Sequence, residues 1–135
     1  MIVLMKQYNI AAILMIVHGG LMELSVCLAL APLLILGVSA NESSHYFSFA
    51  VPYFQDNLYL MMAMSGIFGI TRIIGAIGLL KNRMWGLALS IINCVVTMIL
   101  MVFMLPAGIV DGLFACAALI LILVAYFGDQ RIIKQ

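Results

Sequence analysis

The chain has 135 residues, of which 67% are hydrophobic and only 8% are charged. Soluble domains carry about 25% charged residues, and a chain this short has too little interior to hide so much apolar surface from water. The composition therefore excludes a soluble globular domain and predicts a single integral membrane domain. The net charge of +1 gives no indication of a nucleic-acid partner.

Four apolar segments approach the length of about 20 residues that a helix needs to cross a bilayer. Their apolar runs are continuous and do not alternate with polar residues, which favours helices over the strands of a barrel. The sequence therefore predicts an all-α membrane protein, a four-transmembrane-helix bundle. The expected helices lie at about 10–38, 58–80, 85–105 and 113–127, with a loop at 39–57.

The first predicted helix, 10–38, is long enough to tilt in the bilayer or to protrude from it. It carries His18 and, near the middle of the bilayer, Glu23. On an α-helix these two side chains lie about 140° apart around the axis. The loop at 39–57 is aromatic and polar, which is typical of an interfacial segment and also fits a lid over a cavity.

The second predicted helix, 58–80, carries small residues and one arginine along a narrow stripe that includes Ser65, Gly69 and Arg72. Small residues let membrane helices approach closely, and both Ser65-x-x-x-Gly69 and Thr71-x-x-x-Gly75 fit that pattern. We therefore expect Ser65, Gly69 and Gly75 to mediate helix packing.

The third predicted helix, 85–105, has a second polar stripe, formed by Ser90, Asn93 and Thr97. Asn93 is expected at about the depth of His18 and Arg72, counted inward from the helix ends. The fourth helix, 113–127, contains no charged side chain, so we expect it to pack outside the other three. The connection before it, PAGIVDG, reads as a short turn.

Lysine and arginine gather at the two ends of the chain and between the second and third helices. The other two connections contain only acidic charges. The positive-inside rule therefore predicts a multi-pass protein of the cell membrane with both termini in the cytoplasm. The cations concerned are Lys6, Lys81, Arg83, Arg131 and Lys134, and the acids are Glu42, Asp56 and Asp111.

A charged side chain at membrane depth costs about 2.5–3.5 kcal/mol on insertion scales, and an unpaired one is the least favourable case. We therefore expect Arg72 to pair with Glu23, with Asn93 and His18 beside them. Such a cluster locks the bundle, or lines a polar pocket open to the cytoplasm that binds a small ligand or relays protons, or forms an ion pair across a subunit interface. The sequence shows no catalytic motif and predicts neither a cofactor nor a metal site.

Two local features carry a resemblance to known proteins. A short basic turn with a tryptophan, NRMWG at 82–86, joins the second and third helices, and the first helix contains HGGLMELSVCLAL at 18–30. With these features, the stretch from Ser65 to Ile133 resembles the uncharacterised small four-span integral membrane proteins of prokaryotes. That resemblance implies the topology and no defined activity. The position of Glu23 in the first of four helices also resembles that of the membrane glutamate in small multidrug-resistance transporters. The long loop after Val38 and the charge of Arg72 depart from their pattern.

The sequence thus predicts a non-enzymatic membrane protein that acts as an interaction or assembly subunit or as a homo-oligomer. Its expected partners are the lipid bilayer and a second copy or another membrane protein, with no nucleic acid. The alternative is a small-solute or proton-coupled transporter. In that case Glu23 is the titrating group, and Arg72 is its counter-ion or an anion ligand.

Overall fold

The computed structural model describes residues 6–38, 52–103, 105 and 108–128, so residues 39–51 of the predicted loop lie outside the described part. All the regular elements in this part are helices, and four helical stretches are long and apolar enough to cross a membrane. The first stretch is continuous and contains three elements: α1 (Lys6–Val17), the π-helix η1 (His18–Glu23) and α2 (Leu24–Ile35). The others are α5 (Leu58–Leu80), α6 (Met84–Phe103) and α7 (Ile109–Phe127), and a short α4 (Pro52–Asp56) precedes α5.

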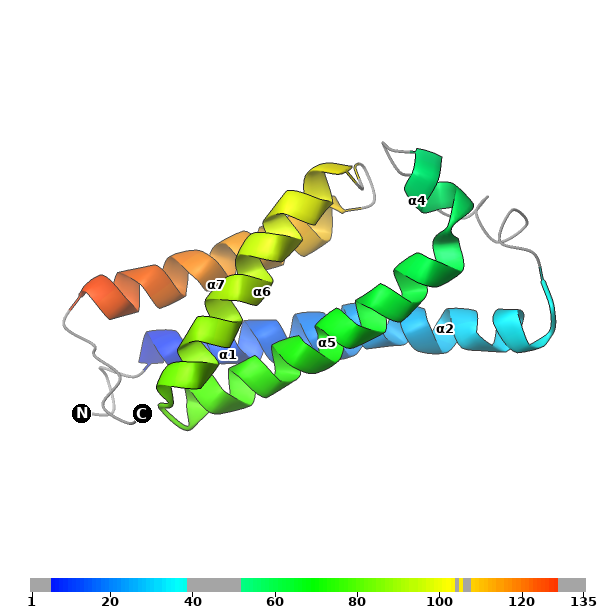
Figure 1. Cartoon of the computed structure of the whole chain (residues 1–135). Coiled ribbons are helices and arrows are strands. Elements are labelled where there is room, and N and C mark those ends of the chain that lie inside the picture. The colour runs from blue at the N-terminus through cyan, green and yellow to red at the C-terminus, as the bar shows by residue number, and fades with distance from the viewer. Residues whose placement is uncertain (1–5, 39–51, 104, 106–107, 129–135) are drawn as a thin grey trace.

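The helices form a bundle that is closed at one end and open at the other (Figure 1). At the closed end α5 packs against α1 and α6, and α7 packs against α6 and α1. The start of α1, the end of α7 and the turn between α5 and α6 all lie at this end (Figure 1). Beyond η1, α2 continues beside α5 while α6 and α7 diverge from this pair, which opens the bundle.

The expectation that the fourth helix packs outside the other three is wrong, because α7 fills the space between α6 and α1. Its buried face consists mostly of small residues at helical spacing, which let neighbouring helices approach closely. The helix also begins at Ile109 and not at Leu113, so Asp111 lies in its first turn and not in a loop. An acidic side chain there complements the positive end of the helix dipole. The buried residues of α7 are Gly112, Ala115, Ala118, Ile122 and Ala125.

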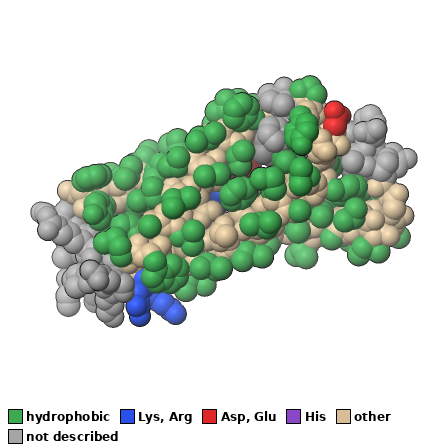
Figure 2. Space-filling view, in the orientation of Figure 1, with side chains coloured by type: hydrophobic (Ala, Val, Ile, Leu, Met, Phe, Trp, Pro, Cys, Tyr) green, Lys and Arg blue, Asp and Glu red, His purple; other side chains and the backbone are tan. Residues whose placement is uncertain are grey.

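Large apolar side chains cover the outside of the bundle along most of its length (Figure 2). Leu28 is 73% exposed and Leu113 65% exposed, a degree of exposure that lipid tolerates and water does not. Lysine and arginine gather at the end that carries the α5–α6 turn, and acidic side chains are visible at the other end (Figure 2). The surface therefore has the pattern of a multi-pass membrane protein.

The α5–α6 turn brings two glycines into backbone contact. Asn82 turns the chain with a φ of 57°, and the Arg83 backbone N–H donates to the Gly78 carbonyl at 3.0 Å. A Cβ built on Gly78 lies 2.7 Å from Gly86 Cα and 2.7 Å from the Trp85 ring. Because one of these neighbours is backbone, the contact has no room for a side chain.

Gly78→Ala is expected to destabilise the bundle by about 1–3 kcal/mol, the usual cost of overpacking. Gly20→Ala is the matched control, because a Cβ at Gly20 meets nothing within 4 Å. The measurement is the unfolding midpoint of each variant in detergent micelles. Equal midpoints for the two variants would show that the helices are not this close in solution.

Candidate functional site

The π-helix η1 turns two polar side chains toward the same point. In a π-helix the backbone hydrogen bonds join residues five apart and each turn is wider than in an α-helix, so the first and sixth residues lie closer to one side of the helix than they would in an α-helix. In η1 these residues are His18 and Glu23. His18 Nδ1 lies 2.6 Å and Glu23 Oε1 lies 3.1 Å from the same atom, Nη1 of Arg72. The 140° separation expected for an α-helix is therefore removed by the wider turn.

Arg72 is the centre of this site. It projects from α5, and its side chain is only 1% exposed. Besides its two contacts through Nη1, it donates a hydrogen bond through Nη2 to Thr97 Oγ1 on α6. A guanidinium is always charged and can only donate, so every neighbour must present an acceptor. Arg72 thus ties η1, α5 and α6 together.

His18 extends the network to the fourth helix. Because Arg72 donates to His18 Nδ1, that nitrogen must carry the lone pair, and we assign the proton of the neutral ring to Nε2. His18 Nε2 lies 3.0 Å from Asp111 Oδ1 on α7, where it donates. The ring also packs against Phe114, with centroids 5.6 Å apart. The network therefore reaches every helix of the bundle.

Asp111 and Thr97 are members of this site that sequence reasoning did not select. Asp111 follows a Pro/Gly-rich stretch and reads as part of a turn, but the apolar run from Ile109 onward gave a signal that the helix begins before it. Thr97 was placed on the polar stripe of the third helix, without a partner. Thr97 lies one turn beyond Asn93, and the extended side chain of Arg72 reaches it there.

Asn93 does not join the charged network, although the sequence suggested that it would. It is buried, but its Oδ1 accepts from Thr71 Oγ1 at 3.1 Å. Its Nδ2 donates to the Leu89 carbonyl at 2.9 Å. Asn93 therefore fastens α6 to α5 on the closed side of Arg72, and its hydrogen bonds are those of a packing residue.

The three predicted packing residues lie at helix contacts. Ser65 Oγ donates to the Glu23 carbonyl at 3.2 Å. A Cβ on Gly69 would lie 3.0 Å from the Gly19 carbonyl oxygen, so the wide π turn rests directly on α5. Gly75 meets Ser90 on α6, where a Cβ would lie 3.2 Å from Ser90 Oγ. Ser65 and Gly69 therefore position the turn that carries Glu23.

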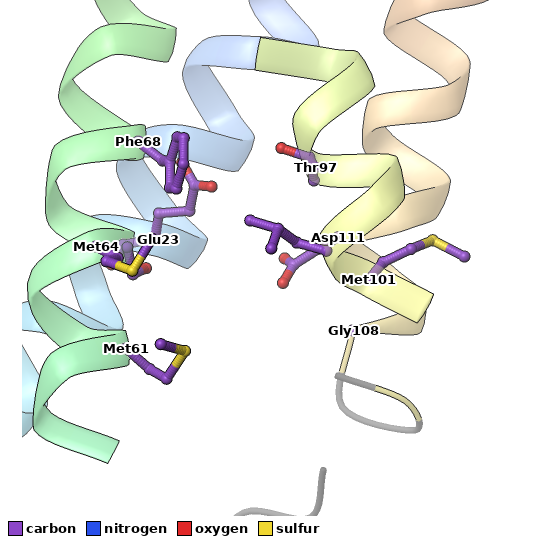
Figure 3. A pocket seen from close by; sticks show the side chains of 10 residues that line it. Glu23, Met61, Met64, Phe68, Thr97, Met101, Gly108 and Asp111 are labelled. Atoms are coloured by element: carbon purple, nitrogen blue, oxygen red, sulfur yellow. The ribbon is translucent and has the colours of Figure 1, made fainter. Parts of the chain in front are cut away.

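A cavity of about 90 Å³ lies beside the network, between η1, α5, α6 and α7 (Figure 3). Glu23 and Asp111 line its walls, together with Met64 and Phe68, whereas Arg72 does not. The Glu23 side chain is 12% exposed and that of Asp111 is 34% exposed. The second carboxylate oxygen of Glu23, Oε2, is buried and has no hydrogen-bond partner among the described residues.

The sequence predicted a pocket open to the cytoplasm, on the side to which the positive-inside rule assigns Lys81 and Arg83. The cavity is instead lined by Met61 from the first turn of α5 and by Gly108 just before α7, which places it toward the opposite end. The reason is Arg72 itself, because its side chain fills the bundle between the cavity and the basic turn.

Comparisons of this chain with protein-family models, with curated proteins and with solved structures found no match. The resemblance to four-span prokaryotic proteins therefore stays a prediction. Among the residues that the structure describes, no group of three or more histidine, cysteine or acidic side chains is placed to hold a metal ion.

Arg72→Met is expected to destabilise the protein by about 3–5 kcal/mol at pH 7, because it leaves the Glu23 carboxylate buried without its cation. Adding Glu23→Gln to this variant removes the orphaned charge and should recover part of the loss. The measurement is a double-mutant cycle on the free energy of unfolding. Additive effects of the two substitutions would contradict the ion pair.

Proposed function

We propose that this chain is a non-enzymatic, multi-pass protein of the cell membrane that admits a small solute to the cavity beside Glu23 and Asp111. One observation carries the proposal: two carboxyl groups are held in a network across the whole bundle and also line a cavity. A buried ion pair is often no more stabilising than apolar packing of the same volume. A network that served only to lock the helices gains nothing from a cavity against its acids.

The proposed orientation follows from the charges. The positive-inside rule places Lys81, Arg83 and both termini in the cytoplasm. The cavity, which lies toward the other end, then faces the outer side. In this orientation the layer formed by Arg72, His18 and Thr97 is the barrier between the cavity and the cytoplasm. A full transport cycle requires these contacts to break and re-form.

An interaction or assembly subunit is the second candidate function. It is favoured by the position of α2, which packs against α5 and η1 and makes no comparable contact with α6 or α7. Such a subunit has no need for water to reach Glu23 or Asp111. Access of water to the cavity therefore separates the two candidates.

Cysteine labelling tests this access. In a variant with Cys27, Cys94 and Cys116 replaced by alanine, Met64→Cys places a thiol on the cavity wall. We expect a membrane-impermeant methanethiosulfonate reagent to label it at least tenfold faster from the outer side than from the cytoplasmic side. Ile67→Cys is the matched control on α5, because Ile67 is 62% exposed on the outside of the bundle and should face lipid.

The measurement is the labelling rate in sealed vesicles of each orientation, followed by mass spectrometry. A Met64→Cys thiol as unreactive as the Ile67→Cys thiol would show a dry cavity and contradict solute entry. Faster labelling from the cytoplasmic side would contradict the proposed orientation.

A further inference from the structure

The charges around the cavity do not balance. Glu23 and Asp111 supply two carboxylates, and Arg72 supplies one guanidinium. His18 accepts from Arg72 and is therefore neutral in this arrangement. The network keeps a formal charge of −1 inside a bundle whose surroundings are apolar. Asp111 is 34% exposed and lies in the first turn of α7, so its negative charge is partly stabilised there and is also open to a cation from solution.

Among the residues that the structure describes, no second lysine or arginine lies at the cavity. Residues 7–71 and 84–130 contain no lysine or arginine. The described cations other than Arg72 lie at the closed end of the bundle, where α1 begins and where α5 turns into α6. His45 is present in the outer connection, but an unperturbed histidine is mostly neutral at pH 7. A cation that pairs with these acids can therefore come from solution.

The cavity walls suit a cation with an apolar part. Acceptor atoms are offered by the two carboxyl groups and by Ser65. Much of the remaining wall is methionine and aromatic: Phe68 presents a ring, which attracts cations, and Met64 presents a polarizable thioether (Figure 3). The guanidinium of Arg72 is hidden behind Glu23 at 1% exposure, so an anion finds no positive group on the wall.

We propose that the cavity binds a small alkylammonium ion, an inference that rests on the proposed function. Its ammonium group hydrogen-bonds to Glu23 Oε2 and to the Asp111 carboxylate, and its short alkyl group lies among the methionines. The cavity volume of about 90 Å³ favours a small ligand. A soft metal ion fits less well, because the Met101 sulfur packs against Gly112 and the described residues offer no three-ligand group.

Three probes of equal length and different charge test the proposal: propylammonium, 1-propanol and propanoate. The protein is placed in nanodiscs of neutral phosphatidylcholine, and binding is measured at pH 7 by ligand-observed saturation-transfer NMR against empty nanodiscs. Propylammonium should bind, and the alcohol and the anion should bind at least tenfold more weakly. Glu23→Gln and Asp111→Asn should each weaken propylammonium binding at least tenfold. Asp56→Asn, which removes an exposed acid on α4, should leave it unchanged.

The outcomes separate the inference from the proposed function. Equal or tighter binding of propanoate or 1-propanol would contradict a cationic ligand but would still be consistent with a solute cavity. Unchanged affinity in Glu23→Gln and Asp111→Asn, or no binding of propylammonium, also overturns the cation. A cavity that is closed to thiol reagents overturns the proposed function itself.

A second pair of variants keeps the test decisive if Glu23→Gln or Asp111→Asn does not fold. Met64→Lys places a tethered ammonium at the cavity, and Met64→Glu adds a third carboxylate with a similar flexible side chain. Met64→Lys should melt at least about 5 °C above Met64→Glu and should reduce propylammonium binding at least tenfold, because it supplies the missing charge. Equal melting temperatures, or a higher one for Met64→Glu, would show that the cavity does not need a cation.

Discussion

A guanidinium that cannot lose its proton, buried between apolar helices, is the constraint on which the rest of this structure depends. Helices in lipid are not driven together by the hydrophobic effect, because lipid tails are as apolar as the side chains they meet. Packing alone therefore specifies weakly which helix lies next to which. Arg72 adds direction, because its donors require acceptors at fixed angles. Those acceptors come from η1 and α6, and through His18 the requirement reaches Asp111 on α7. The neighbours around the bundle are set by one side chain.

The π-helix is the local consequence of that constraint. A regular α-helix can direct His18 or Glu23 at Arg72 but not both, since the two side chains point about 140° apart. The wide turn solves this, and it is possible here because Gly69 has no side chain to obstruct the Gly19 carbonyl. π-Helical turns are rare in proteins, and those that occur are often found at functional sites. Here the turn places one carboxylate oxygen of Glu23 on the guanidinium and leaves the other, Oε2, without a partner among the described residues.

The sequence predicted the coarse fold and part of the site. These are the features whose physical signals are local in the chain. Long apolar runs predict spanning helices directly, and the structure has four of them. The cost of an unpaired charge in the bilayer predicted that Glu23 and Arg72 meet, and the structure places their atoms 3.1 Å apart. Asp111 was missed because a proline and a glycine before it and a glycine after it signal a turn. The direction of the His18 side chain was predicted from the 3.6-residue period of an α-helix. This segment is a π-helix with a wider turn, so the side chain points elsewhere.

The orientation proposed for the chain and the ligand proposed for the cavity have a common origin in the distribution of cations. The described lysines and arginines other than Arg72 lie at one end of the bundle, and such an asymmetry is what orients a membrane protein. The segments 39–57, before α5, and 104–112, which runs into the first turn of α7, contain acids and no lysine or arginine. A flexible lysine in an outer connection would neutralise Glu23 or Asp111 and close the site. In the orientation we propose, its absence leaves one negative charge open to the outer solution, where a solute cation competes with water and protons.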